Sequence, residues 1–153
     1  MPENYQIDKL DKNILNALMV NARAPYADLA KRFKVSPATI HVRVEKMKVA
    51  GIIEGTRLVV DEKSLGFDVC CFIGVNLRSA GDYHHVIEKL ESFDEVVEAY
   101  YTTGQYSVLV KIMCQSIEAL QWILIDKIQA IKQVQSTETL ISLQNPIKRD
   151  IHP

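Results

Sequence analysis

The chain has 153 residues, 48% of them hydrophobic and 24% charged, which is the composition of a globular protein with one domain or two small ones. No apolar run approaches the roughly 20 residues that span a bilayer, and the polar N-terminus is unlike a signal peptide, so we expect a cytoplasmic protein. The three cysteines (Cys70, Cys71 and Cys114) fit neither a disulfide framework nor a metal site. We expect them to be small buried apolar side chains.

Charge is divided unevenly along the chain. Residues 1–60 carry 10 Lys or Arg and 6 Asp or Glu, a net charge of +4, whereas residues 61–153 carry 8 and 13, a net charge of −5. A basic N-terminal part joined to an acidic remainder is typical of a protein that contacts a polyanion with one part only. Small domains also drift by a few charges, so the asymmetry alone decides little.

The first predicted helix begins after Asp8 and ends near Asn21. Asp8 can cap the helix, Asp11 stands where it can complete a capping box, and Ile7 can pack back on the first turn. Apolar residues follow at helical spacing, namely Leu10, Ile14, Ala17 and Leu18.

Two further helices are predicted, a short one that Pro25 opens and a longer one over residues 36–50. In the longer helix Ser36 can cap the first turn, and Pro37 suits the first helical position. Gly51 suits the left-handed residue that follows a helix.

Two short helices joined by a tight turn form a helix-turn-helix, whose second helix enters the major groove of DNA. The pattern predicts this unit over residues 25–44. Residues 52–60 favour a β-ribbon with its turn at Gly55-Thr56, which would be a wing. We therefore predict a winged helix-turn-helix domain over residues 1–60, followed by a polar linker over residues 61–68.

The rest of the chain, residues 69–153, alternates between strand and helix patterns. The predicted elements are a strand over Val69–Leu77, a helix over Ser79–Glu91, strands over Val96–Thr102 and Tyr106–Met113, a helix over Ser116–Gln129 and a strand over Val134–Leu143. This βαββαβ order is the ferredoxin-like pattern. The predicted fold class is α+β.

Side chains that lie off the apolar stripe of the 36–50 helix are candidates for DNA contacts. Arg43 is favoured for base recognition because Arg to guanine is the commonest specific contact, and Val42 could contact a thymine methyl. Basic residues of the preceding helix are expected to contact phosphates. The candidates are Lys31, Arg32, Lys34, Ser36, Thr39, His41, Val42, Arg43 and Lys46. Taken alone, the helix could equally be an ordinary amphipathic surface helix.

A second candidate site surrounds Gly104. The segment 100–107 gathers tyrosines, hydroxyls and an amide around this glycine, which would let backbone amides approach a carboxylate. Ser136 and Thr137 add short polar side chains in a strand that is expected to be buried. A hairpin with tyrosines on the sheet, and Thr as an ordinary β residue, would explain the same pattern without a ligand.

The predicted helix over residues 116–129 carries a second apolar stripe with Trp122 and Ile125. Large apolar side chains on two faces favour an interface with another subunit. The alternative is that Trp122 lies partly exposed against its own neighbours.

Catalysis is not expected, and neither a metal nor a cofactor is predicted. His84 and His85 are adjacent and so point apart on a helix, and the sequence holds no Cys-x-x-Cys, His-x-x-x-His, Gly-x-Ser-x-Gly or phosphate-binding glycine loop. Two other functions stay open. One is an enzyme or enzyme subunit with an accessory helical domain, and the other is a winged-helix module that binds protein.

Several motifs together resemble the Lrp/AsnC, or feast/famine, family of bacterial and archaeal transcription regulators. They are Asp8-x-x-Asp11, Leu29-Ala-x-x-Phe33, Val35-Ser-Pro-Ala-Thr39, Arg43-Val-x-x-Met47, Gly51-Ile-Ile53 and the Tyr-x-Thr-x-Gly-x-Tyr turn that ends at Tyr106. The resemblance covers nearly the whole chain, and residues 69–153 resemble the family's RAM domain (regulation of amino-acid metabolism). Segments 40–47, 100–104 and 135–139 look closest to the asparagine-responsive members.

The resemblance implies a sequence-specific DNA-binding regulator of amino-acid metabolism genes, with its own gene among the candidates. It implies homodimers that form through the RAM sheets and assemble further, often to octamers, and a small amino acid, L-asparagine, bound between dimers. The effector contacts would be Tyr100, Thr102, Thr103, Gly104, Gln105, Tyr106, Ser107, Ser136 and Thr137. Many relatives carry Asp in place of Ser107, so the resemblance does not say what holds the effector's ammonium group.

Overall fold

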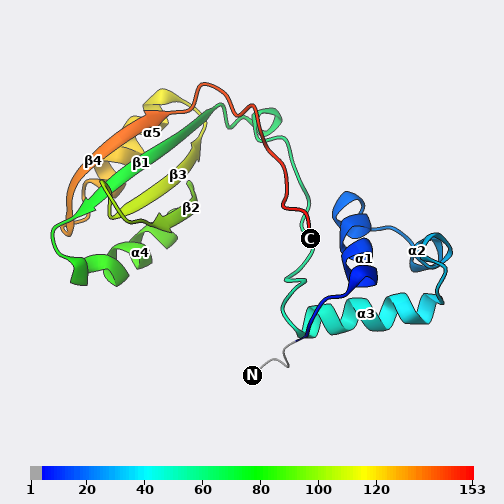
Figure 1. The fold of residues 1–153 in the computed structure, drawn as a ribbon. Coiled ribbons are helices and arrows are strands. Elements are labelled where there is room, and N and C mark those ends of the chain that lie inside the picture. The colour runs from blue at the N-terminus through cyan, green and yellow to red at the C-terminus, as the bar shows by residue number, and fades with distance from the viewer. Residues whose placement is uncertain (1–4) are drawn as a thin grey trace. The chain divides into compact units, whose positions relative to one another are not determined.

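A computed structural model describes residues 5–153 of the chain (Figure 1). Its internal contacts divide the chain into two units. The C-terminal unit is Val60–Lys148, and the N-terminal unit ends at Val59 and also includes Arg149–Pro153. None of the described helices is long and apolar enough to cross a membrane.

The N-terminal unit is a three-helix domain, made of α1 (Lys9–Val20), α2 (Tyr26–Phe33) and α3 (Pro37–Val49). All three helices contribute to one small apolar core, which confirms the predicted stripes. Its buried residues are Ile14, Leu15, Leu29, Ala30, Ile40, Val44 and Met47.

The helix ends follow the predicted capping. The Asp8 carboxylate accepts the N–H of Asp11 at 2.9 Å, and the Asp11 carboxylate accepts the N–H of Asp8 at 3.0 Å, which completes a capping box. After α3, Gly51 has a φ of +73°, and the N–H of Ile52 donates to the carbonyl of Met47 at 2.9 Å, as in a Schellman motif.

The predicted wing is wrong, because residues 52–60 contain no strand. No backbone hydrogen bond joins any two residues between 54 and 60, and the side chains of Leu58 and Val59 are 82% and 79% exposed. A two-stranded ribbon is stable only when a third strand or a packed surface supports it. In the N-terminal unit no such surface covers these apolar side chains. Further along, the predicted linker holds a short 3-10 helix, η1 (Lys63–Leu65).

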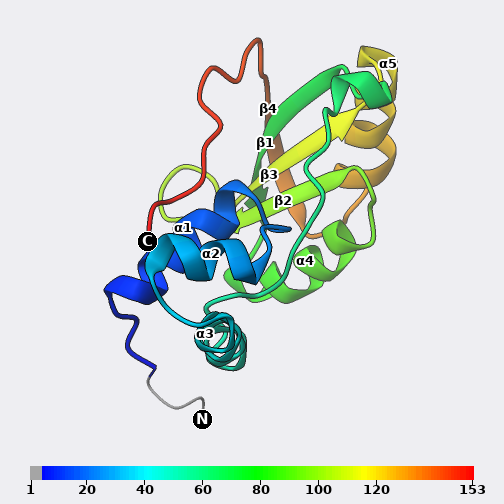
Figure 2. The ribbon, with the colours of Figure 1, turned by 90° about the vertical axis from the view of Figure 1, so that its right-hand side faces the viewer.

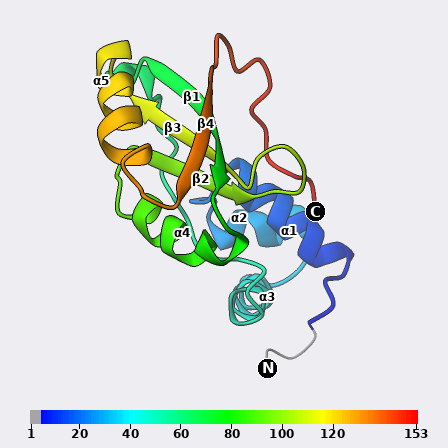
Figure 3. The same ribbon diagram turned by 90° about the vertical axis from the view of Figure 1, so that its left-hand side faces the viewer.

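The C-terminal unit is a four-stranded antiparallel sheet with helices, so the α+β fold class and the ferredoxin-like order are confirmed. The strands are β1 (Val69–Leu77), β2 (Val96–Tyr101), β3 (Val108–Cys114) and β4 (Val134–Ile141), in the spatial order β2-β3-β1-β4. The helices α4 (Tyr83–Glu91) and α5 (Ile117–Trp122) cover the same face of the sheet (Figures 2 and 3).

Alternate residues of each strand point to opposite faces of this sheet. On β1, Cys71, Ile73 and Val75 are buried beneath the helices. The other face is free of helices of this unit, and we call it the open face. From β1 and its paired strands it carries Phe72, Gly74, Asn76, Glu98, Tyr100, Leu109, Lys111, Ser136, Glu138 and Leu140.

Two predicted helices differ in detail from the structure. The helix predicted to begin at Ser79 opens with a 3-10 turn, η2 (Ala80–Asp82), before α4. The helix predicted over residues 116–129 changes after α5 into a π-helix, η3 (Ile123–Ile128), and the N–H of Gln129 donates to the carbonyl of Leu124 at 2.8 Å.

Trp122 and Ile125 are 52% and 50% exposed, on the outer side of α5 and η3. The Trp122 ring lies 4.7 Å from Lys127 Nζ, which also bonds Glu95 at 2.7 Å. A subunit interface on this surface stays a prediction, since Trp122 already contacts its own neighbours.

Candidate DNA-binding face and effector turn

The helix α3 begins at a turn that Ser36 caps. The Ser36 hydroxyl accepts the N–H of Thr39 at 3.0 Å, Pro37 occupies the first helical position, and the hydroxyls of Ser36 and Thr39 are 2.8 Å apart. Two of the predicted DNA contacts are thus bonded to each other at a helix N-terminus. Such a terminus also favours a bound anion such as a phosphate.

One face of α3 gathers four of the predicted DNA contacts. Thr39, Val42, Arg43 and Lys46 follow the spacing i, i+3, i+4 and i+7. All four line a shallow groove of about 500 Å³, together with Ser36 and with residues at the start of α1 that include Asp8 and Asp11. The side chain of Val42 is 50% exposed. An exposed apolar side chain among polar ones on this face could contact a thymine methyl.

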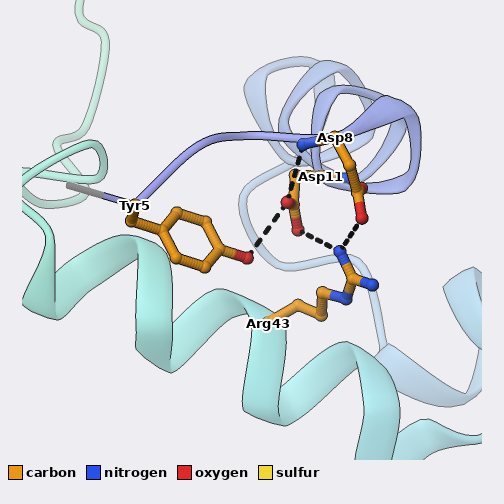
Figure 4. A network of polar contacts seen from close by, with 4 residues as sticks. All are labelled: Tyr5, Asp8, Asp11 and Arg43. Carbon is orange, nitrogen blue, oxygen red and sulfur yellow. Dashed lines mark hydrogen bonds and ion pairs between the residues drawn. The ribbon is translucent and has the colours of Figure 1, made fainter. Parts of the chain in front are cut away.

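Arg43 is bonded to the start of α1 (Figure 4). Its Nη1 donates to Asp11 Oδ1 at 3.1 Å and also to Asp8 Oδ2. The hydrogen bond from Arg43 lowers the pKa of the Asp8 carboxyl, and the bond to Asp8 raises the pKa of the guanidinium. The side chain that the sequence favours for base recognition is therefore held by two carboxylates of its own domain.

The other predicted DNA contacts lie on neighbouring surfaces of the N-terminal unit. The ring of His41 lies 6.0 Å from that of Tyr26. Lys31, Arg32 and Lys34 are exposed, on α2 and at its C-terminal end. The structure thus brings five candidates together around one groove, Ser36 and the four residues of α3, and places the basic residues of α2 apart from them.

The turn at Gly104 is braced at its base. The Thr102 N–H donates to the Ser107 carbonyl at 3.1 Å, and the Thr102 hydroxyl donates to the Tyr106 carbonyl at 2.6 Å. The Ser107 N–H donates to the Val75 carbonyl at 3.0 Å. Gly104 has a φ of +116°, a backbone angle that residues other than glycine rarely adopt.

Ser107 has a partner that the sequence did not indicate. The pairing of β1 with β4 shifts register between Asn76 and Leu77, and the Leu77 N–H donates to Ser107 Oγ at 3.3 Å. The hydroxyls of Thr102 and Ser107 are therefore both engaged in holding the turn.

The tip of the turn is exposed at Thr103, Gly104 and Gln105. These three residues can present two side chains and backbone groups to a ligand, while the residues below them fix the shape of the turn. A carboxylate is a suitable ligand for backbone amides at such a glycine.

Tyr106 packs against β1 on the open face. A Cβ at Gly74 would lie 2.5 Å from Tyr106 Cδ1, so the ring fills the space that a side chain there would need. The Tyr106 hydroxyl donates to Glu138, which lies opposite Gly74 on β4, and this bond raises the pKa of Tyr106.

The structure separates Ser136 from Thr137. Ser136 Oγ accepts from Asn76 Nδ2 at 3.2 Å on the open face, whereas Thr137 Oγ1 accepts from Gln129 Nε2 at 2.9 Å on the face that the helices cover. A ligand on one face can contact only one of these two side chains. Tyr100 also lies on the open face, with its hydroxyl bonded to Glu98.

Three residues of the two candidate sites were not predicted from the sequence. Gly74 and Glu138 contact Tyr106, and Ala38 lines the α3 groove. A glycine inside a strand pattern indicates a close approach, so Gly74 could have been found. Glu138 could not, because the spacing of residues on one strand does not give its register with another.

No group of three His, Cys, Asp or Glu side chains within residues 5–153 could hold a metal ion. The cysteines are free thiols, with Cys71 and Cys114 buried and Cys70 half-buried. Burial raises the pKa of Cys71 to about 12.

Known proteins match both units. Residues 7–48 match the AsnC-type helix-turn-helix domain, and residues 70–151 match the Lrp/AsnC ligand binding domain. The sequence is 66% identical over 151 residues to the regulatory protein AsnC of Escherichia coli K12 and 62% identical over 149 residues to that of Haemophilus influenzae. These alignments cover 99% and 97% of this chain and 99% of each relative. The solved structure of E. coli AsnC matches with a TM-score of 0.95 over 97% of this chain and 100% of that one.

The chain therefore belongs to the Lrp/AsnC family of transcription regulators, as its motifs predicted. Within that family it is similar over nearly its whole length to the AsnC regulatory proteins. Its N-terminal unit is a helix-turn-helix domain for DNA, and its C-terminal unit is a domain for a small amino-acid ligand. It is a regulator and not an enzyme.

Proposed function

We propose that this regulator binds operator DNA through the exposed face of α3, and that L-asparagine bound at the Gly104 turn modulates the binding. The observation that carries the proposal is the groove beside α3, where Thr39, Val42 and Lys46 lie together on one face. A hydroxyl, an exposed methyl-bearing side chain and an ammonium group can contact base edges and phosphates in a major groove.

The basic residues of α2 have a different proposed task. Lys31, Arg32 and Lys34 contact phosphates, which sets affinity and its salt dependence without distinguishing sequences. A further phosphate binds at the N-terminus of α3, where Ser36 lies. His41 lies at the edge of the DNA interface.

At the effector turn, the exposed backbone near Gly104 suits the carboxylate of an amino acid. Gln105 carries an amide that can pair with the side-chain amide of asparagine, and Thr103 offers a hydroxyl. The walls around the bound effector are formed by the other predicted contacts, namely Tyr100, Thr102, Tyr106, Ser107 and Ser136. Thr137 is left out of the proposed site because it faces the helices.

We also propose that a second copy of the chain covers the open face, and that such dimers assemble to octamers in the cytoplasm. Tyr100 and Leu140 are 51% and 49% exposed on that face, and no helix of the unit covers them. Sedimentation velocity tests this assembly, and a monomer at micromolar concentration would contradict it.

Fluorescence anisotropy with a labelled duplex from upstream of the protein's own gene tests the proposal. We expect binding that weakens steeply with salt and a changed affinity when L-asparagine is added. L-Glutamine, L-aspartate and D-asparagine are matched controls. Equal curves with and without each amino acid would contradict the effector, and no salt-dependent binding to any duplex would contradict the DNA-binding role.

A further inference from the structure

Among residues 5–153, Asp11 is the only charged side chain that is buried, with 1% of its surface exposed. Its Oδ2 accepts the Asp8 N–H at 3.0 Å and the Tyr5 hydroxyl at 3.0 Å, and its Oδ1 accepts from Arg43 at 3.1 Å (Figure 4). Both oxygens of the buried carboxylate are thus satisfied, but only while Arg43 stays in place.

Arg43 joins parts of the chain that are far apart in sequence. Its two carboxylate partners cap the first turn of α1, and Arg43 itself lies in the middle of α3. A guanidinium bound to two carboxylates at a helix start is fixed in direction, so the contact restrains how α3 turns about its own axis relative to α1.

The ion pair between Arg43 and the buried carboxylate of Asp11 also affects which side chains can contact DNA. Arg43 is 29% exposed and has a buried carboxylate beside it. If its guanidinium moved to a guanine, Asp11 would be left buried with an uncompensated charge, which is strongly unfavourable. A contact between DNA and Thr39, Val42 or Lys46 would not leave the buried carboxylate of Asp11 unpaired.

We infer that Arg43 is a positioning residue, which holds the groove face of α3 in the orientation that Thr39, Val42 and Lys46 need in order to contact DNA. The inference rests on the proposed use of α3 in DNA binding. It assigns base discrimination to these neighbours and gives Asp8, Asp11 and Tyr5 an indirect part in operator recognition.

The test compares full-length variants on a duplex that the wild-type protein selects from a randomised library, and on every single-base substitution of it. Arg43→Met is expected to lose roughly 10-fold in affinity on the selected duplex, and to lose preference at all the contacted base pairs together, with no loss confined to one of them. Asp11→Asn should behave similarly, and the double variant should be no weaker than Arg43→Met, because both changes break the same contact. Arg43→Lys should restore part of the loss.

Lys46→Met is the matched control on the same face. Loss of a phosphate contact lowers the slope of log K against log salt by about 1. Lys46→Met should therefore lower the slope, and adding Arg43→Met to Lys46→Met should lower it no further, because Arg43 makes no phosphate contact of its own. Binding is measured at a temperature where circular dichroism shows every variant fully folded. Asp8→Asn, which removes an exposed partner, serves if Arg43→Met does not fold.

Three results would overturn the inference. These are a loss of preference at one base pair in Arg43→Met that Asp11→Asn does not share, a salt slope that Arg43→Met lowers further in the Lys46→Met background, and full affinity in folded Arg43→Met. The proposed function fails in a different way, since the wild-type protein would then select no duplex from the library.

Discussion

The ring of Tyr106 occupies the space that a side chain at position 74 would need, because a Cβ at Gly74 would lie 2.5 Å from Tyr106 Cδ1. Gly74→Ala must therefore displace the ring or the backbone of β1. We expect it to lower the free energy of unfolding of the C-terminal unit by about 1–3 kcal/mol, as overpacking does. Urea denaturation measures this loss.

Gly81→Ala is the control for that experiment, since a Cβ at Gly81 would meet only Ser79 Oγ at 3.8 Å. Tyr106→Leu combined with Gly74→Ala should recover part of the stability. A Gly74→Ala variant as stable as Gly81→Ala would contradict the contact.

Ser107→Ala removes the acceptor of the Leu77 N–H. Because Leu77 is buried and its N–H donates to this hydroxyl, we expect a loss of about 1–3 kcal/mol, the cost of an unsatisfied group. Hydrogen exchange followed by NMR should show the Leu77 amide exchanging faster than in the wild type. Unchanged protection of that amide would show that the Ser107 hydroxyl does not hold it.

Gly104→Asp is expected to abolish amino-acid binding and to spare DNA binding. The substitution places a side chain at a φ of +116°, which strains the turn, and adds a negative charge that repels the effector's carboxylate. Isothermal titration calorimetry with L-asparagine and anisotropy with DNA measure the two effects. Gly104→Ala separates the strain from the charge, and full binding of L-asparagine by the Asp variant would exclude this turn as the site.

The Asp8 carboxyl has a pKa below its ordinary value because it accepts hydrogen bonds from Arg43 and from the Asp11 N–H. A depressed pKa in the folded state stabilises the fold at pH values above the unfolded pKa, here about 3.8, and that stabilisation is lost as the pH falls through the folded pKa. The difference in stability between the wild type and Asp8→Asn should therefore be constant above about pH 5 and shrink below about pH 4. Urea titrations at each pH, followed by the NMR signals of residues 9–49, measure this difference in stability. A difference that does not change with pH would contradict the pairing of Asp8 with Arg43.

Thiol labelling tests the burial of the cysteines. Burial raises the pKa of Cys71 to about 12 and also raises that of Cys114, so neither forms the reactive thiolate at neutral pH. We expect a maleimide to modify at most Cys70 in the folded protein and all three thiols in 6 M guanidinium, as peptide mass spectrometry would show. Modification of Cys71 in the folded state would contradict its place in the core.

Local signals in the sequence predicted much of the fold. The capping box of Asp8 and Asp11 and the Schellman motif at Gly51 join residues within one turn, so residue types at fixed spacing are enough to find them. Helical and alternating apolar patterns likewise gave the three N-terminal helices and all four strands, with ends shifted by up to two residues.

Tertiary relationships were harder to predict. The partners of Arg43 lie 32 and 35 residues away, and nothing in the spacing tells a base-contacting Arg from one that is bonded to α1. The wing failed for a related reason, since residues 52–60 have strand-like composition but no packed surface to support a ribbon. Ser136 and Thr137 looked alike as neighbours, although the alternation of a strand sends them to opposite faces.

The turn between α2 and α3 is formed by Lys34, which has a φ of 57° and a ψ of 45° and is the only residue other than glycine with a positive φ among residues 5–153. Helix-turn-helix turns often contain glycine. This chain instead has a lysine there, in a left-handed backbone conformation that is strained for a residue with a side chain. A genome search that demanded glycine at this position would pass over this chain. A pattern built on the Ser36-Pro37 start of the following helix would retain it.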